Sequence, residues 1–120
     1  AADSLALEKV VAGIRQYSPG NGTSLINALN SINDFEDQPD NMFILTDGLP
    51  TQGAKPPKKY MVSGQQRRSF FAKALDSLPG GMPVNTILFP MEGDPEAAAL
   101  FWQLGVNTQG AFIAPSRDWP

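Results

Sequence analysis

From residue 42 onward, short apolar runs alternate with segments of helical periodicity, and this alternation limits the fold most. The apolar runs cover 42–46, 84–89 and 111–114, and the helical segments between them cover about 65–78 and 94–104. The first run has no polar–apolar alternation, so it predicts a parallel strand that is covered on both faces. Strands that alternate with helices form a parallel sheet joined by right-handed crossovers. The chain is therefore predicted to be an α/β domain.

Two further helices are predicted before the first strand. Apolar residues recur at three- and four-residue steps from Ser4 to Tyr17, and a second stripe runs through about 23–35, with Thr23 as the expected N-cap. The run 42–46 then lies at a sheet edge, or pairs with a strand outside these residues. A wholly apolar parallel strand at an open edge promotes aggregation. Residues 1–120 are therefore interpreted as one partial domain, the C-terminal part of a larger one, which can also pair with another chain through this edge.

The composition removes several classes of chemistry. The 120 residues include no cysteine and no histidine, so the chain alone cannot supply a thiolate nucleophile, a disulfide, a histidine-based triad or an ordinary zinc site. Its oxygen donors suit hard cations such as Mg²⁺, Mn²⁺ or Ca²⁺. The net charge of −3 gives no broad attraction to nucleic acid or anionic membrane. We therefore expect no nucleic-acid partner and no direct membrane contact.

Acidic residues follow the predicted strands at the edge where open α/β sheets bind ligands. Asp47 follows the first strand, Glu92 and Asp94 follow the second, and residues 116–118 follow the third. Each also has a simpler interpretation. Asp47 can bond the turn that follows it, Asp94 has the position of a helix N-cap, and Glu92 can be a solvated loop acid. Taken singly, none of these residues defines a site.

Three segments together resemble the C-terminal half of a von Willebrand factor type A domain. GNGTSLINALNSI, residues 20–32, has the pattern Gly-x-Thr followed by a helix with Ala-Leu. NMFILTDGLPTQG, residues 41–53, is a strand that ends in Thr-Asp-Gly, and TQGAFIAP, residues 108–115, is similar to the last strand of that family. The resemblance implies a three-layer, parallel-stranded, Rossmann-like fold, present here in part as about three strands with flanking helices.

The resemblance also implies a metal-ion-dependent adhesion site. In that family a divalent cation is held by an Asp-x-Ser-x-Ser motif, by a Thr in a second loop and by an Asp in a third. Thr23 and Asp47 match the last two, and the candidates around them are Gly22, Ser24, Gly48 and Glu92. The Asp-x-Ser-x-Ser motif does not occur in the 120 residues. Mg²⁺, Mn²⁺ or Ca²⁺ is therefore expected to bind this chain alone weakly or not at all.

The function implied by the resemblance is a non-enzymatic, protein-binding module whose cation takes a carboxylate from a protein partner. One alternative is a degenerate structural or oligomerisation module without metal. A phosphate-binding, nucleic-acid-binding or hydrolytic α/β domain is a weaker alternative. No G-x-x-x-x-G-K-[ST] loop is present, and Leu45 stands where a haloacid dehalogenase-type phosphatase has its nucleophile.

A basic cluster and the compartment leave further alternatives open. Five of the nine basic residues lie within 14 positions: Lys55, Lys58, Lys59, Arg67 and Arg68. Such a cluster is typical of a solvated loop beside a helix, or of the rim of a protein-binding face. The compartment is not fixed by the sequence. The resemblance to bacterial envelope proteins is consistent with an exported or membrane-anchored parent protein.

Overall fold

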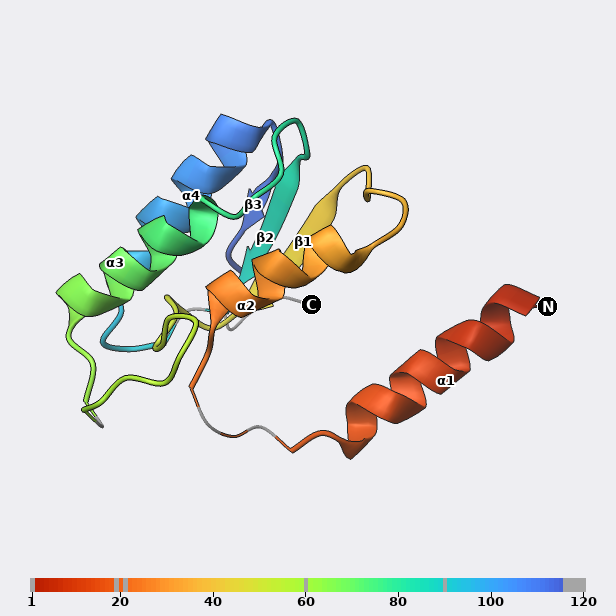
Figure 1. Ribbon diagram of the computed structural model, residues 1–120, viewed down its shortest axis with the longest axis horizontal. Helices are drawn as coiled ribbons and strands as arrows, with labels where there is room; N and C mark the ends of the chain where they lie inside the picture. The colour runs from red at the N-terminus through yellow and green to blue at the C-terminus, as the bar shows by residue number, and fades with distance from the viewer. Residues whose placement is uncertain (1, 19, 21, 60, 90, 116–120) are drawn as a thin grey trace.

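The computed structural model describes residues 2–18, 20, 22–59, 61–89 and 91–115. The elements are α1 (Ala2–Gln16), α2 (Leu25–Asn30), the 3₁₀ helix η1 (Ser31–Asp34), β1 (Met42–Thr46), α3 (Gly64–Leu75), β2 (Val84–Leu88), α4 (Ala97–Thr108) and β3 (Phe112–Ile113). The three strands form one parallel sheet in the order β1-β2-β3, flanked by helices (Figure 1). The predicted α/β class is confirmed, and β1 lies at an edge of the sheet.

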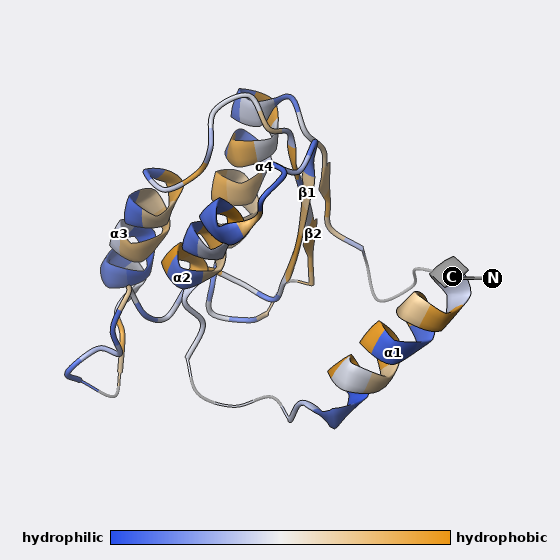
Figure 2. Ribbon diagram, turned by 45° about the vertical axis from the view of Figure 1, so that its right-hand side comes forward, coloured by the Kyte–Doolittle hydropathy of each residue, from blue (hydrophilic) through white to orange (hydrophobic). Residues whose placement is uncertain are grey.

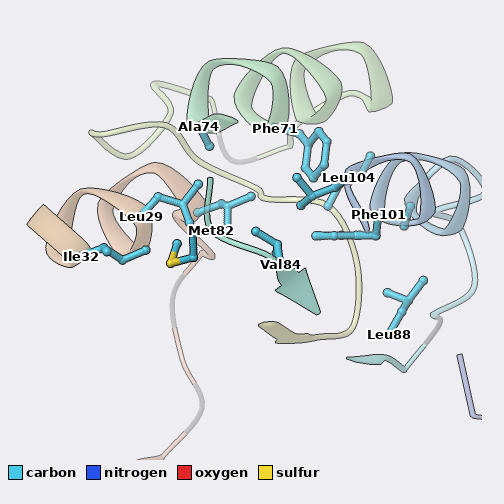
Figure 3. Packing of buried hydrophobic residues seen from close by; sticks show 12 residues of the cluster. Leu29, Ile32, Phe71, Ala74, Met82, Val84, Leu88, Phe101 and Leu104 are labelled. Atoms are coloured by element: carbon cyan, nitrogen blue, oxygen red, sulfur yellow. The ribbon is translucent and has the colours of Figure 1, made fainter. Parts of the chain in front are cut away.

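Helices α2, α3 and α4 pack on one face of the sheet, as Figure 2 shows from the side. Successive side chains of a strand point to opposite faces, and Val84, Thr86 and Leu88 of β2 are all buried on the helical side. The core continues from these residues into the three helices. In Figure 3, α3 and α4 meet through Phe71 and Phe101, whose rings lie edge to face with centroids 5.0 Å apart.

The opposite face of the sheet is exposed in the part of the chain that the structure describes. Phe43 and Leu45 of β1 keep 65% and 66% of their surface exposed, and Ile113 of β3 keeps 45%. The prediction that β1 is covered on both faces was therefore wrong for the described residues. Both faces of β1 carry apolar residues, as the sequence indicates. A sequence pattern does not show, however, whether other segments of the same chain pack on each face.

Helices α2 and α4 begin at other residues than predicted, and both differences bear on the site. Ser24 is the N-cap of α2, because its hydroxyl accepts the N–H of Asn27 at 3.3 Å, whereas Thr23 was expected in this role. Helix α4 begins at Ala97, and the Asp94 side chain does not cap it. Both Thr23 and Asp94 are therefore available for other contacts.

Helix α1 stands apart from the sheet and from the other helices (Figure 1). It forms where the periodicity predicts a helix, but its apolar residues Leu7, Val10 and Ile14 are exposed. It contacts none of the other described helices or strands. Among the helices of the described ranges, none combines the length and the apolar character needed to cross a membrane.

One buried polar group has an energetic consequence. The hydroxyl of Thr86 lies in the core with no hydrogen-bond partner among the described residues. We predict that Thr86→Val raises the free energy of unfolding by about 1 kcal/mol, because Val has nearly the same shape and removes a desolvated hydroxyl.

The matched control is Thr108→Val. The Thr108 hydroxyl accepts the N–H of Val84 at 3.0 Å and donates to the carbonyl of Leu104 at 2.8 Å. This substitution should lower the free energy of unfolding by about 1–3 kcal/mol, because it leaves a backbone donor unpaired. Urea denaturation followed by circular dichroism measures both changes. Destabilisation by both variants alike would contradict the interpretation of Thr86.

Candidate functional site

The loop before α2 is joined to the loop after β1 by several hydrogen bonds at the carboxyl edge of the sheet. The N–H of Thr23 donates to Oγ1 of Thr51 at 2.8 Å. In return, the N–H groups of Thr51 and Gln52 donate to the Thr23 carbonyl at 3.0 and 3.1 Å. The hydroxyl of Ser24 donates to the Gly53 carbonyl at 2.8 Å. These bonds position Thr23 next to the loop that follows Asp47.

Gly22 and Ser24 serve this junction rather than a ligand. A Cβ atom at Gly22 would lie 2.8 Å from Oγ1 of Thr51, so a larger residue would push the two loops apart. The carbonyl of Gly22 also accepts a hydrogen bond from the Gln52 side chain at 2.8 Å. The Ser24 hydroxyl is already occupied as the N-cap of α2 and as the donor to Gly53. Of the residues 22–24, Thr23 alone has a hydroxyl without a described partner.

The turn after β1 is held by Thr46 and not by Asp47. Oγ1 of Thr46 accepts the N–H of Gly48 at 3.3 Å and donates to the Gly48 carbonyl at 2.8 Å. The Asp47 side chain is exposed, and none of the described residues forms a hydrogen bond or an ion pair with it. The simpler interpretation, in which Asp47 bonds the turn, therefore does not fit this geometry. Its carboxylate is free to meet a ligand.

A largely buried ion pair binds the backbone of Leu49, in the loop after β1. Arg67 of α3 and Asp94 of the loop before α4 meet at 2.8 Å, with 21% and 7% of their side chains exposed. Oδ2 of Asp94 also accepts the N–H of Leu49 at 2.7 Å, and Nε and Nη2 of Arg67 donate to the Leu49 carbonyl at 3.2 and 2.6 Å. The backbone N–H and the carbonyl of Leu49 are thus both hydrogen-bonded to one ion pair. We call Arg67, Asp94 and the Leu49 backbone the loop latch.

Gly48 lies against the loop latch and leaves it room. A Cβ atom at this position would lie 2.5 Å from Oδ2 of Asp94 and 3.1 Å from Nη2 of Arg67. Any larger residue would therefore disturb the ion pair. The Gly of Thr-Asp-Gly is required here for close packing, since its φ angle is not among the positive ones in the described residues.

The other predicted candidates do not join Thr23 and Asp47. Glu92 lies exposed in the loop after β2, and no described contact links it to either residue. Residues 116–118 lie outside the described ranges. Sequence analysis missed the loop latch, because it assigned Asp94 to a helix cap and Arg67 to a solvated basic cluster. Local sequence chemistry holds no signal for this contact, which depends on the parallel pairing of β1 with β2 that brings the loops after both strands together.

A small cavity lies between the loop before α2 and the loop after β1. Its volume is about 140 Å³, and it is lined by Thr23 and Ser24 from one loop and by Thr46 and Gly48 from the other, with apolar residues including Phe101 behind them. Thr23 and the residues that flank Asp47 therefore line the same cavity. The structure brings together the loops of the two predicted metal ligands.

The donor chemistry at this edge fits a hard cation in part. A threonine hydroxyl and a carboxylate are oxygen ligands of the kind that Mg²⁺, Mn²⁺ and Ca²⁺ take in proteins, and both lack a described partner. Within the described ranges, no group of three or more Asp or Glu residues could hold a metal ion. Two ligands from this chain leave the remaining positions to water or to groups supplied from elsewhere. Thr23 and Asp47 remain predicted ligands of such an ion.

Comparison with known proteins adds no identification. No family model matches the chain, and no curated protein or solved structure matches it.

The loop latch gives a prediction about stability. Asp94→Ala leaves the Arg67 guanidinium without its carboxylate and the Leu49 amide without its acceptor. We expect the free energy of unfolding to fall by about 3 kcal/mol, because breaking a buried pair leaves an uncompensated charge. Denaturant titration of the variant measures this loss.

The matched control breaks the second ion pair between α3 and the start of α4. Arg68 and Glu96 lie 3.0 Å apart with 51% and 44% of their side chains exposed. Arg68→Ala should cost less than about 1 kcal/mol, since solvent-exposed pairs contribute little. Equal losses in Asp94→Ala and Arg68→Ala would show that the loop latch has no special role.

Proposed function

We propose that this chain is the C-terminal part of a von Willebrand factor type A module, and that the module binds a protein partner without catalysing a reaction. The observation that carries the proposal is that the Asp47 carboxylate and the Thr23 hydroxyl, on two loops that line one cavity, have no partner among the described residues. Neighbouring polar groups of the described residues are occupied in holding the two loops. The resemblance of residues 20–32 and 41–53 to that family supports the same assignment.

In the proposed module, Thr23 and Asp47 hold a divalent cation together with ligands from an Asp-x-Ser-x-Ser segment upstream. The cation would supply positive charge for a carboxylate of the partner, since hydroxyl ligands leave much of its charge unneutralised. The loop latch keeps the peptide after Asp47 in place, and the junction with Thr51 keeps Thr23 in place. Prepared geometry of this kind lowers the cost of ordering the site when the ligand binds.

The absence of histidine and cysteine supports a binding role rather than a catalytic one. An enzyme built on these residues would have to use Asp47 as its nucleophile or base. Leu45, two residues before it, is exposed on the bare face of the sheet and offers no second carboxylate.

The first test reads the residues encoded upstream of Ala1. A strand that ends in Asp-x-Ser-x-Ser, roughly 50 to 80 residues before Thr23, leaves room for the βα units that belong between them at about 30 residues each. In the polypeptide that includes this strand, Asp47→Ala should weaken Mn²⁺ binding at least about tenfold, because the ion loses one of its few carboxylates. Isothermal titration calorimetry measures the affinity.

The control is Asp76→Ala, which removes an exposed carboxylate from the C-cap of α3. This variant should bind Mn²⁺ like the wild type, and both variants should unfold at nearly the wild-type temperature. Mn²⁺ affinity that is unchanged in Asp47→Ala, or partner binding that persists in excess chelator, would refute the metal-dependent mechanism.

A second candidate function is pairing with another chain through β1. Its five residues lie at the edge of the sheet, and the apolar residues Phe43 and Leu45 face solvent. An exposed, apolar edge strand is a template for pairing with a further strand. This observation favours the metal-free oligomerisation module as the alternative.

The second candidate predicts that the chain self-associates in solution. Leu45→Lys should convert the associated form to monomer, because a charge on the edge strand opposes pairing. Trp102→Lys is the control, since Trp102 is a comparably exposed apolar residue on α4, away from the edge. Sedimentation equilibrium measures the mass of each variant. A monomeric wild type, or a Leu45→Lys variant of unchanged mass, would exclude this candidate.

A further inference from the structure

A groove lies beside the candidate site, between the start of α2 and the long loop that joins β1 to α3. Its volume is about 640 Å³, and its lining includes Gly22, Thr51, Pro56, Pro57, Lys59 and Val62. This volume lies within the roughly 300–1,000 Å³ of small-ligand sites. The groove adjoins Thr23, because Thr51 lines it and accepts the N–H of Thr23.

The groove lies in a part of the chain that carries only positive charge. No Asp or Glu occurs between Gly48 and Leu75, although the whole chain has a net charge of −3. Arg67 and Arg68 in this part are paired with acids of the loop before α4. Lys55, Lys58 and Lys59 are exposed, and none of them has an ion-pair partner among the described residues.

The loop that carries these lysines is held in place at several points. Pro56 and Pro57 restrict their own φ angles to about −65°. The residues just before them are bonded to α2, where Ser24 donates to the Gly53 carbonyl and Asn27 donates to the Ala54 carbonyl at 3.3 Å. The unpaired ammonium groups therefore extend from a supported backbone, and a partner would not have to order this loop on binding.

We propose that this groove binds an extended, acidic segment of the protein partner. Carboxylates of the segment pair with Lys59, which lines the groove, and with Lys55 and Lys58 of the same loop, and its apolar parts contact Pro56, Pro57 and Val62. The inference rests on the protein-binding role proposed above and specifies the partner: an acidic segment that runs along the groove toward Thr23. One of its carboxylates then lies where the cation would take it.

A short acidic peptide fits these charges better than a nucleic acid does. A long polyanion would be repelled by the net negative charge of the chain and by the acidic run Asp34, Glu36, Asp37 and Asp40. A peptide segment needs to approach only the groove itself. The experiment must therefore distinguish binding of an acidic peptide from binding of an oligonucleotide.

The test uses fluorescence anisotropy with a labelled decapeptide of alternating Glu and Pro, which is extended in solution. The reference peptide has Gln in place of Glu, and a single-stranded oligonucleotide of similar charge is the third probe. We expect the wild-type chain at low ionic strength to bind the Glu peptide at least about tenfold more tightly than the other two probes, because recognition depends on charge and on fit. Excess chelator should leave this binding largely intact, since the lysines act without metal.

In the double variant Lys58→Glu and Lys59→Glu, the affinity for the Glu peptide should fall at least about tenfold, because like charges then face each other. The control Lys73→Glu reverses an exposed charge in the last turn of α3, away from the loop that lines the groove, and should bind like the wild type. Circular dichroism checks that all variants are folded.

Three results would overturn the inference: no binding of the Glu peptide, equal loss in Lys73→Glu, or oligonucleotide binding as tight as peptide binding. Failure of the proposed function is seen separately, as Mn²⁺ affinity that does not change in Asp47→Ala. A groove that binds peptide while Asp47→Ala leaves Mn²⁺ binding unchanged would keep the lysine site and remove the metal site. The reverse pair of results would keep only the metal site.

Discussion

The carboxyl edge of this sheet depends on one ion pair between residues far apart in sequence. Arg67 comes from α3, Asp94 from the loop after β2, and both bind the Leu49 peptide in the loop after β1. Removing one partner of a charge pair that lies mostly out of water is costly, because the other charge is left buried and uncompensated. The Arg67–Asp94 pair joins three segments at the edge where an open α/β sheet binds its ligands.

The polar groups around the candidate site divide into two kinds. Thr46, Ser24 and Thr51 use their hydroxyls to bond backbone groups of the two loops. The Thr23 hydroxyl and the Asp47 carboxylate have no partner among the described residues. Holding a site with neighbouring residues while leaving the ligand-binding atoms unoccupied is how a protein prepares a binding geometry in advance. This division is the basis for the proposed ligand-binding role of both residues, and the lysines of the adjacent loop are the basis for proposing an acidic partner segment.

Much of the fold could be predicted from the sequence, because its signals are local. The apolar run 42–46 coincides with β1, and the helix predicted over about 65–78 overlaps α3. The N-cap of α2 was one residue off, since Thr23 and Ser24 are both good capping residues and the hydrogen bond to Thr51 decides between them. Helix α4 continues past its predicted end near residue 104 and ends at Thr108, where Gln109 follows in a left-handed conformation.

The loop latch and the bare face could not be predicted, for physical reasons. Asp94-Pro95-Glu96 reads as a helix start on local chemistry, and the acceptor role of Asp94 toward Leu49, 45 residues earlier, requires the three-dimensional pairing of β1 with β2. The apolar sequence of β1 indicates that other segments can pack on both of its faces. It does not indicate which segments these are. The candidate site was predicted from the resemblance of residues 20–32 and 41–53 to a known family. The contacts that free Asp47 for a ligand were visible only in the fold.

The central claim is that the loop latch fixes the loop after β1 and leaves Asp47 projecting from a rigid backbone. Native-state hydrogen exchange at the Leu49 amide tests this most directly, because that N–H donates to Asp94 and is protected only while the latch is closed. The account predicts that the Leu49 amide exchanges as slowly as the Thr86 amide of the central strand, and that Asp94→Ala abolishes its protection. A Leu49 amide that exchanges at the rate of an unstructured loop in the wild-type chain would contradict the claim.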